Sequence, residues 1–318
     1  VGIIYIYTKT PDQSFAIESF YKAALSNNEQ MWLFWIMFVA FAVKMPIFPL
    51  HTWQPDTYEQ SPTATTMVLS GVMVKMGVFA TLRWLIPIIP VGSWAWGDTV
   101  STLAVIGMIY ASLIAMRQDD MKRLIAYSSI AHVGLMCLAI FATDTLGMQG
   151  VMIQMFNHGI NIIGLWIVVE LIERQFNTRK MSELGGIAQK APALAILFVV
   201  VALANVALPL TNAFVGEFLM FTGVFNSNVT KFNIPFAVIA AITVILSAIY
   251  TLNMLQKVLY GQTSAITANA KDVKFNEKMI LSVIVVLILV IGVYPKPMLE
   301  LTQSTVDTIL SRMITKHP

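Results

Sequence analysis

The chain has 318 residues, of which 57% are hydrophobic and only 12% are charged, and its formal net charge is +3. Soluble domains carry about 25% charged residues, so this composition excludes that class and indicates an integral membrane protein. The single cysteine, Cys137, lies in an apolar run, and there is no CxxC pair, GxGxxG motif or P-loop, so we expect no cofactor or metal site on this chain.

Eight long apolar runs follow one another along the chain and predict an all-α membrane fold. A helix needs about 20 apolar residues to cross a bilayer. The runs lie near 31–50, 63–86, 99–116, 122–142, 147–171, 191–222, 233–259 and 279–296. Residues 1–7 are typical of the end of a further helix, so we expect this chain to be part of a longer protein. We expect surface segments at 8–30, 261–278 and 298–315, the last of them amphipathic.

Two of the predicted helices are interrupted by proline. The first run ends in Lys44-Met-Pro-Ile-Phe-Pro, and the sixth, which is too long for one ordinary span, has Pro209 before Glu217. Proline removes a backbone donor and clashes with the preceding turn, so we expect both helices to open there. Broken helices in corresponding positions of two halves often mark an ion or substrate site. We therefore interpret Lys44 and Glu217 as counterparts in two related helix bundles.

The basic residues are concentrated in alternate loops. Lys and Arg are frequent at 117–123, 174–190 and 257–278, whereas the loops between them have one or none. By the positive-inside rule, the basic loops face the cytoplasm or the matrix or stroma of an organelle. The alternation supports the number of spans and places the three basic loops on one side of the membrane.

Five of the eight runs carry one ionisable residue near the middle. These residues are Lys44, Lys75, His132, His158 and Glu217. A charge at bilayer depth costs roughly 2.5 to 3.5 kcal/mol on insertion scales, so residues of this kind usually serve a function. The pattern predicts a path for protons or cations.

Lys75 and Glu217 are the charged residues in the most apolar surroundings. Lys75 lies among Val, Met, Gly and Phe, too central in its run for the side chain to reach the interface easily, although snorkelling is the alternative. Glu217 follows Gly216 directly after the second break. A carboxyl group there can bind and release a proton, and structural pairing with a lysine is the alternative interpretation.

The two histidines have polar neighbours at helical spacing. Ser128 and Ser129 precede His132 by four and three residues, and Gln154 and Asn161 bracket His158. Histidine can pass a proton between its two nitrogens, and hydroxyl and amide groups can extend such a relay. The alternative is a pair of core histidines that bind a neighbouring helix.

The acidic residues closer to the helix ends have a simpler interpretation. We expect them to make helix-end or loop contacts with the basic residues nearby, because solvated pairing explains them without a role in proton transfer. They are Asp56, Asp119, Asp120, Glu170 and Glu173.

Several motifs resemble the antiporter-like membrane subunits of respiratory complex I, the proton-translocating NADH:quinone oxidoreductase. They are FAVKMPIFPLHTWQPD from Phe41, SPTA from Ser61, LSG from Leu69, VKMG from Val74, KRLIAYSSIAHVG from Lys122, NHG from Asn157, ELGG from Glu183 and FVGEF from Phe214. Within that family the motifs are most similar to the group of bacterial chain M and mitochondrial subunit 4. The resemblance covers essentially the whole chain.

The resemblance implies a fourteen-helix fold, of which this chain would hold the last eight helices, with breaks near Lys44 and Pro209. It implies a single transmembrane domain over 1–318, with the end of a first helix bundle at 1–86, a second bundle at 99–259, and the last helix and tail at 279–318. Lys44 would pair with a glutamate on an upstream helix, and Lys75 would be the connecting lysine. His132 and His158 would bridge to Glu217, the terminal proton carrier.

One departure from the family pattern bears on the second break. Leu210-Thr211-Asn212 stands where the family usually has a glycine–threonine arrangement, which leaves the local geometry open.

These features predict a membrane subunit that moves protons along the Lys, His and Glu residues while partner subunits carry out electron transfer. NADH, FMN, iron–sulfur clusters and quinone are expected on those partners, which include neighbouring antiporter-like subunits, and no nucleic acid is expected. We expect a bacterial plasma membrane, with the mitochondrial inner membrane as the alternative. A subunit of a multi-subunit Na+/H+ antiporter or membrane-bound hydrogenase is the first alternative function, and a scaffold that does not pump is the second.

Overall fold

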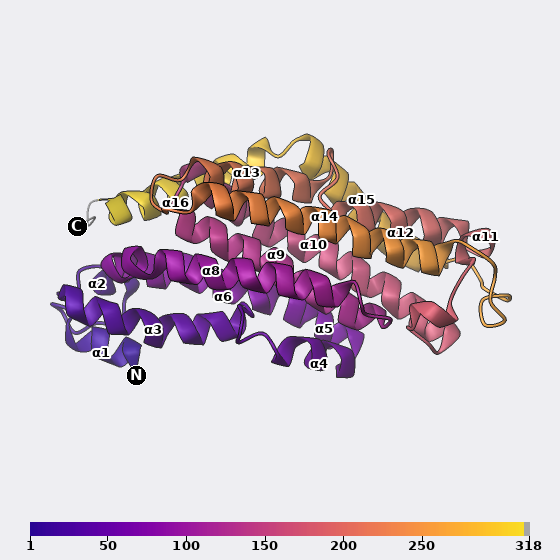
Figure 1. Ribbon diagram of the computed structural model, residues 1–318, viewed down its shortest axis with the longest axis horizontal. Helices are drawn as coiled ribbons and strands as arrows, with labels where there is room; N and C mark the ends of the chain where they lie inside the picture. Colours follow the sequence, from indigo (N-terminus) through magenta and orange to yellow (C-terminus); the bar gives the residue numbers. More distant parts are fainter. Residues whose placement is uncertain (315–318) are drawn as a thin grey trace.

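The computed structural model describes residues 1–314, and this part of the chain is helical, with one isolated β-bridge between Asp120 and Lys180 (Figure 1). The helices before the first basic loop are α1 (Gly2–Thr8), α2 (Ile17–Phe20), α3 (Asn27–Lys44), α4 (Trp53–Gln60), α5 (Thr63–Val68), α6 (Val74–Ala80), α7 (Ile86–Ile88) and α8 (Pro90–Ala115). Those after it are α9 (Met121–Ala142), α10 (Thr145–Phe176), α11 (Ile187–Lys190), α12 (Pro192–Asn205), α13 (Asn212–Asn226), α14 (Asn233–Leu259), α15 (Phe275–Val293) and α16 (Lys296–Ile314).

The predicted all-α membrane fold is confirmed. Six uninterrupted helical stretches in the described residues are long and apolar enough to cross a bilayer: Thr63–Ile88, α8, α9, α10, α14 and α15. Of the other two predicted runs, 31–50 corresponds to α3 and the break that follows it, and 191–222 corresponds to the broken pair α12/α13. The largest difference from a predicted boundary is at α8, which begins at Pro90 and not near 99. Proline is compatible with the first turn of a helix, and the polar residues Ser93 and Asp98 do not stop it.

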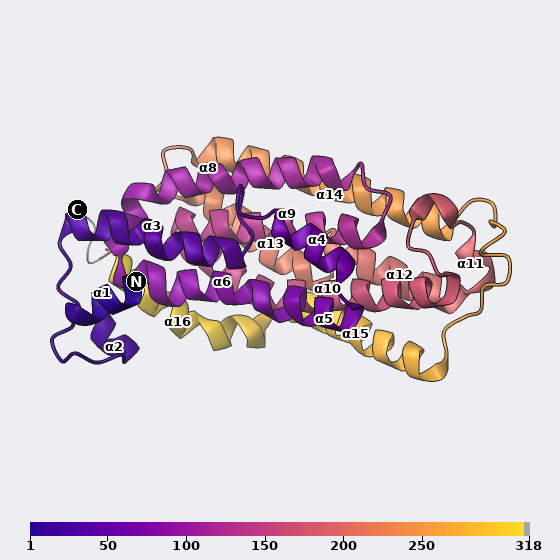
Figure 2. The ribbon, with the colours of Figure 1, turned by 90° about the horizontal axis from the view of Figure 1, so that it is seen from below.

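Helix α9 lies at the centre of the bundle. In Figure 1 it runs between α6 and α8 on one side and α13 and α14 on the other, and in Figure 2 it lies between α8 and α14 along one edge and α6 and α10 along the other. In the most apolar stretch of α9, 94% of the residues are buried inside the protein. Polar and ionisable side chains at bilayer depth are costly unless they face the interior of the helix bundle or water. Polar groups on α9 and α10 therefore face other helices and not lipid.

Both predicted breaks are present. α3 ends at Lys44 and α4 begins at Trp53, while α12 ends at Asn205 and α13 begins at Asn212. The second break passes through Leu210 with a φ of 75°, in the left-handed region that favours glycine. The chain therefore turns between α12 and α13 at the position where the family pattern has its glycine–threonine arrangement.

The three basic loops meet at one end of the molecule, as the charge alternation predicts. The backbone N–H of Met121 donates to the carbonyl of Arg179 at 3.1 Å, and that of Gly186 donates to the carbonyl of Tyr260 at 3.1 Å. The first bond joins the start of α9 to the loop after α10. The second joins the loop after α10 to the loop after α14.

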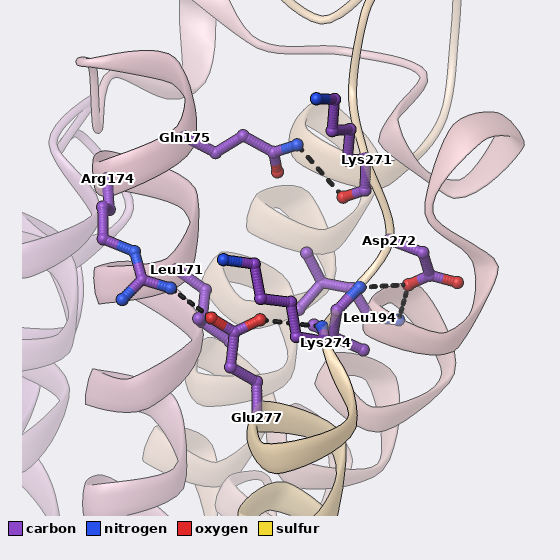
Figure 3. Close-up of a pocket in the computed structure, with 9 residues that line it drawn as sticks. Leu171, Arg174, Gln175, Leu194, Lys271, Asp272, Lys274 and Glu277 are labelled. Atoms are coloured by element: carbon purple, nitrogen blue, oxygen red, sulfur yellow. Dashed lines mark hydrogen bonds and ion pairs between the residues drawn. The ribbon is translucent and has the colours of Figure 1, made fainter.

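Asp272, in the third basic loop, caps a helix that lies far from it in sequence (Figure 3). Its carboxylate accepts the backbone N–H groups of Ala193 and Leu194, in the first turn of α12, at 2.9 and 3.0 Å. Burial alone would raise the pKa of Asp272, but the backbone donors Ala193, Leu194 and Val273, together with Lys278, lower it below its ordinary value.

Replacing Asp272 with alanine is expected to destabilise the protein by about 1 kcal/mol, the usual effect of losing a helix cap. Because the folded-state pKa is lowered, the charge-dependent part of this stability is present above the unfolded pKa of about 3.9 and is lost as the pH falls through the folded value. Unfolding midpoints of both proteins in detergent would differ between pH 5 and 7 and converge toward pH 3. A difference that stays constant down to pH 3 would contradict this assignment.

The predicted amphipathic segment is α16, which packs against α7 and α10. Val306, Ile309, Leu310 and Met313 are buried on one face.

Candidate functional site

Four of the five predicted residues form one buried row. Lys75 Nζ lies 2.7 Å from His158 Nδ1, and His132 Nδ1 lies 3.0 Å from Glu217 Oε1. The two imidazole rings have centroids 5.5 Å apart. The row crosses four helices, from α6 through α10 and α9 to α13, and none of the four residues is more than 8% exposed.

The position of Lys75 depends on an irregular turn before it. Residues 69–73 are π-helical, and Lys75 Nζ donates to the carbonyl of Ser70 at 2.5 Å. The Ser70 hydroxyl accepts the indole N–H of Trp166, on α10, at 2.7 Å. Single π-helical turns often occur at functional sites because they re-aim side chains. Here the turn directs the ammonium group towards α10.

Gly77, on the same helix as Lys75, lies against the backbone of the first break. A Cβ atom at Gly77 would lie 2.7 Å from the backbone nitrogen of Met45, the residue after Lys44. Only glycine allows the end of α3 to pack this closely on the helix that carries Lys75.

Lys44 itself is not part of the row. Its side chain is exposed at the end of α3, and no acidic partner for it lies within residues 1–314. Its predicted role therefore remains an expectation from the resemblance.

Glu217 is held by the helix that faces it. Gln154 Nε2 donates to Glu217 Oε1 at 3.4 Å. A side chain at Gly216 would collide with Gln154. The glycine therefore leaves the space that the side-chain amide of Gln154 occupies beside Glu217. The shared acceptor Oε1 thus joins the carboxylate to both α9, through His132, and α10.

Asparagine side chains of α10 bind the open backbone of the second break. Asn157 Nδ2 donates to the carbonyl of Asn212 at 2.7 Å, and Asn161 Nδ2 donates to that of Ala204 at 3.2 Å. The carbonyl of Ala204, near the C-terminal end of α12, also accepts the backbone N–H of Ala207 at 3.1 Å, so the amide of Asn161 adds a second donor where the helix opens. The polar stripe around His158 therefore also stabilises the break.

A hydroxyl cluster lies beside the row and was not predicted. The Ser128 hydroxyl accepts from Tyr250 Oη at 2.9 Å and from Asn205 Nδ2 at 3.1 Å. Tyr250 also lines a small hollow that contains His132 and Glu217. No local pattern in the sequence indicates that Tyr250 or Asn205 belongs here, because only the packing of α14 and α12 on α9 brings them together.

Several buried polar atoms along the row have no protein partner among the described residues. They are His132 Nε2, His158 Nε2, Gln154 Oε1, Asn157 Oδ1, Ser129 Oγ and Ser247 Oγ. Buried polar groups are nearly always hydrogen-bonded, to protein or to ordered water. These atoms are therefore the groups along the row that remain available to bind ordered water.

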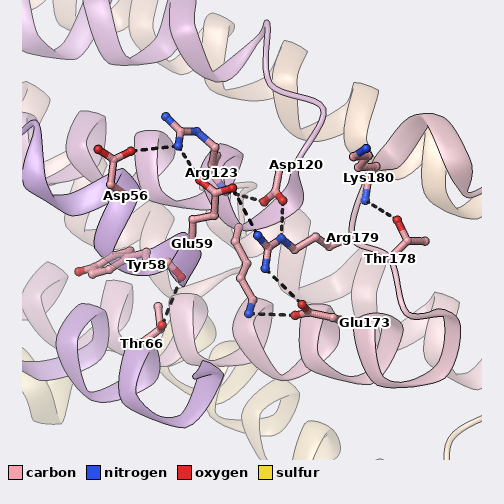
Figure 4. Close-up of polar contacts among 11 residues, drawn as sticks. Asp56, Tyr58, Glu59, Thr66, Asp120, Arg123, Glu173, Thr178, Arg179 and Lys180 are labelled. Carbon is pink, nitrogen blue, oxygen red and sulfur yellow. Dashed lines mark hydrogen bonds and ion pairs between the residues drawn. The ribbon is translucent and has the colours of Figure 1, made fainter. Parts of the chain in front are cut away.

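Three of the five acidic residues in the predicted group, Asp56, Asp120 and Glu173, form ion pairs at the basic-loop end (Figure 4), whereas Asp119 accepts the backbone N–H and the hydroxyl of Ser182. Arg123 pairs with Asp56 at 3.0 Å and with Glu59, and Arg179 pairs with Asp120 and Glu173. Burial of the network was not predicted from the sequence. The Lys122 side chain is only 5% exposed and lies 2.9 Å from Glu173. Its opposite charges come from separate segments, so the sequence alone could not pair them.

Replacing Arg179 with alanine is expected to destabilise the protein by about 2 kcal/mol, because Asp120 and Glu173 lose a partner at partly buried positions. Replacing Lys180 with alanine is the matched control, since this neighbouring side chain is 62% exposed and should change stability by about 0.5 kcal/mol or less. Unfolding midpoints in detergent measure both effects. Equal midpoints for the two variants would show that the network contributes little.

Fold and site together define a multi-pass helical membrane protein with a buried row of titratable groups that ends at the second broken helix. The chain belongs to the family described as NADH:quinone oxidoreductase/Mrp antiporter, transmembrane, which matches residues 1–247.

Relatives and solved structures agree with this family. The chain is 36% identical over 315 residues to NADH-quinone oxidoreductase subunit M of Rickettsia typhi, covering 98% of this chain and 62% of that relative. It superposes on a chain of respiratory complex I from Thermus thermophilus with a TM-score of 0.90 and 27% identity, covering 98% of this chain and 65% of that one. A chain of the Mrp complex from a Dietzia species gives a TM-score of 0.87 at 17% identity, covering 97% of this chain and 64% of that one, which shows a shared fold.

Proposed function

We propose that this chain is the proton-translocating part of a membrane subunit of complex I, most similar to subunit M. The observation that carries the proposal is the pair of direct contacts, Lys75 to His158 and His132 to Glu217, within one buried row. Identity to a relative named as subunit M supports the assignment to complex I. The partners would be the other membrane subunits of that complex, in a bacterial plasma membrane.

The row can transfer protons because each member can both accept and donate. A protonated Lys75 donates through Nζ to His158 Nδ1, and loss of a proton from His158 Nε2 through water would then reach the ring of His132. His132 in turn donates through Nδ1 to Glu217 Oε1. Each imidazole thus uses one nitrogen toward its charged partner and keeps the other for water.

Charge at one site influences the next because the interior is poorly solvated. Coulomb interactions are stronger there than in water, so a proton added to Lys75 changes the proton affinity of His158. Electron transfer would take place on partner subunits that carry NADH, FMN, iron–sulfur clusters and quinone, and this chain would respond through its charged row without redox chemistry of its own.

Sodium/proton antiport is the second candidate function, and the fold shared with the Mrp complex favours it. The two can be separated in the native organism by deleting the gene and restoring it. If the proposal holds, membrane vesicles without this chain lose NADH-driven acidification, and the restored gene recovers it in buffers with or without sodium. Unchanged NADH-driven acidification, together with loss of sodium tolerance, would instead assign the chain to an antiporter.

A further inference from the structure

A pocket of about 260 Å³ opens at the basic-loop end, where α10, α12 and α15 meet. Its walls are of two kinds. Leu171, Leu194 and Val273 are apolar, whereas Arg174, Lys271 and Lys274 are cationic. Figure 3 shows that the side chains of Arg174 and Lys274 extend into the same space, while Asp272 is directed toward the start of α12.

The acidic residues of this pocket are already engaged. Asp272 accepts three backbone N–H groups, and Glu277 pairs with Arg174 and accepts the backbone N–H of Lys274. The ammonium groups of Lys271 and Lys274 have no acidic partner within residues 1–314. The pocket therefore carries an excess of positive charge that the protein does not neutralise.

The pocket lies where an apolar helix face begins. Phe275, the first residue of α15, is 79% exposed, and Met279, Ile280 and Val283 on the following turns are about half exposed. An exposed apolar face on a spanning helix is a lipid contact surface. A molecule in the pocket would thus contact cationic groups in the pocket itself and the apolar surface of α15 next to it.

We propose that this pocket binds the headgroup of an anionic phospholipid, with the acyl chains lying along α15. The phosphate would contact Lys271, Lys274 and the exposed part of Arg174, and the more accessible Val273 and Phe275 would contact the first carbons of the chains. Basic pockets between helix ends on the cytoplasmic side are typical sites for such headgroups. The site is independent of the function proposed above.

Lipid binding can be measured on the purified, delipidated complex by native mass spectrometry, titrated separately with phosphatidylglycerol, phosphatidylcholine and inorganic phosphate. The variant Lys271→Gln/Lys274→Gln removes two pocket charges. Lys190→Gln/Lys257→Gln is the matched control, because it removes two exposed charges at the same end but outside the pocket.

We expect phosphatidylglycerol to bind more tightly than the other two probes. The pocket variant should weaken that binding roughly 30-fold, at about 1 kcal/mol for each basic residue, and the control variant should change it less than about threefold. Equal weakening by both variants would show general surface attraction and overturn the proposal. Equal binding of phosphatidylcholine, or equally tight binding of inorganic phosphate, would overturn it as well.

Discussion

Replacing Lys75 with methionine should reduce proton translocation by about 100-fold, the lower range of what a positioned proton donor or acceptor contributes. Lys75 Nζ is the group in contact with His158 Nδ1, so its loss removes one end of the row. Methionine has a similar length and needs no hydrogen bond, so the helix should remain packed and the complex should assemble. NADH-driven acidification of vesicles, compared with the amount of assembled complex, measures the effect.

The control for Lys75 is Lys257→Met, which removes an exposed lysine at the basic-loop end. It should leave both pumping and assembly unchanged. Normal pumping by assembled complex with Lys75→Met would favour the scaffold interpretation over a relay.

Replacing Glu217 with glutamine should reduce pumping by a similar factor. The amide keeps the shape of the carboxylate and can still bond to His132 and Gln154, but it cannot accept and release a proton at neutral pH. A structural role would survive this change, whereas a role in proton transfer would not. The same vesicle measurement, made with Glu217→Asp for comparison, separates the two.

The aspartate variant retains an ionisable group on a shorter side chain, so we expect partial recovery of pumping relative to glutamine. Glu300→Gln, at an exposed position on α16, is the matched control for loss of a carboxylate. Equal pumping by Glu217→Gln and the control would contradict the terminal role of Glu217.

Local signals in the sequence explain which parts of the fold could be predicted. Long apolar runs and prolines are signals within the sequence of a single helix. They predicted the membrane spans and the breaks after Lys44 and Asn205. The start of α8 at Pro90 was missed because polar residues in its first turns weaken the apolar signal.

The site was predicted as a set of residues, but not as an arrangement. Spacing along a helix placed His158 near Gln154 and Asn161, yet contacts between helices depend on packing that no local pattern encodes. For this reason the sequence could not show that Lys75 meets His158, or that Tyr250 joins Ser128. Lys44 is a case in which a local signal was misleading. Its position at a helix break suggested that it belongs to the row, but within the described residues its side chain is exposed and lies outside the row.

If the proposed function holds, titratable groups from four helices form one hydrated route for protons. The most direct measurement is an experimental density map of the intact complex that shows ordered water. We predict water bound to His158 Nε2 and His132 Nε2, linking the two rings between Lys75 and Glu217. A dry gap filled by apolar side chains between these rings would show that no such route exists.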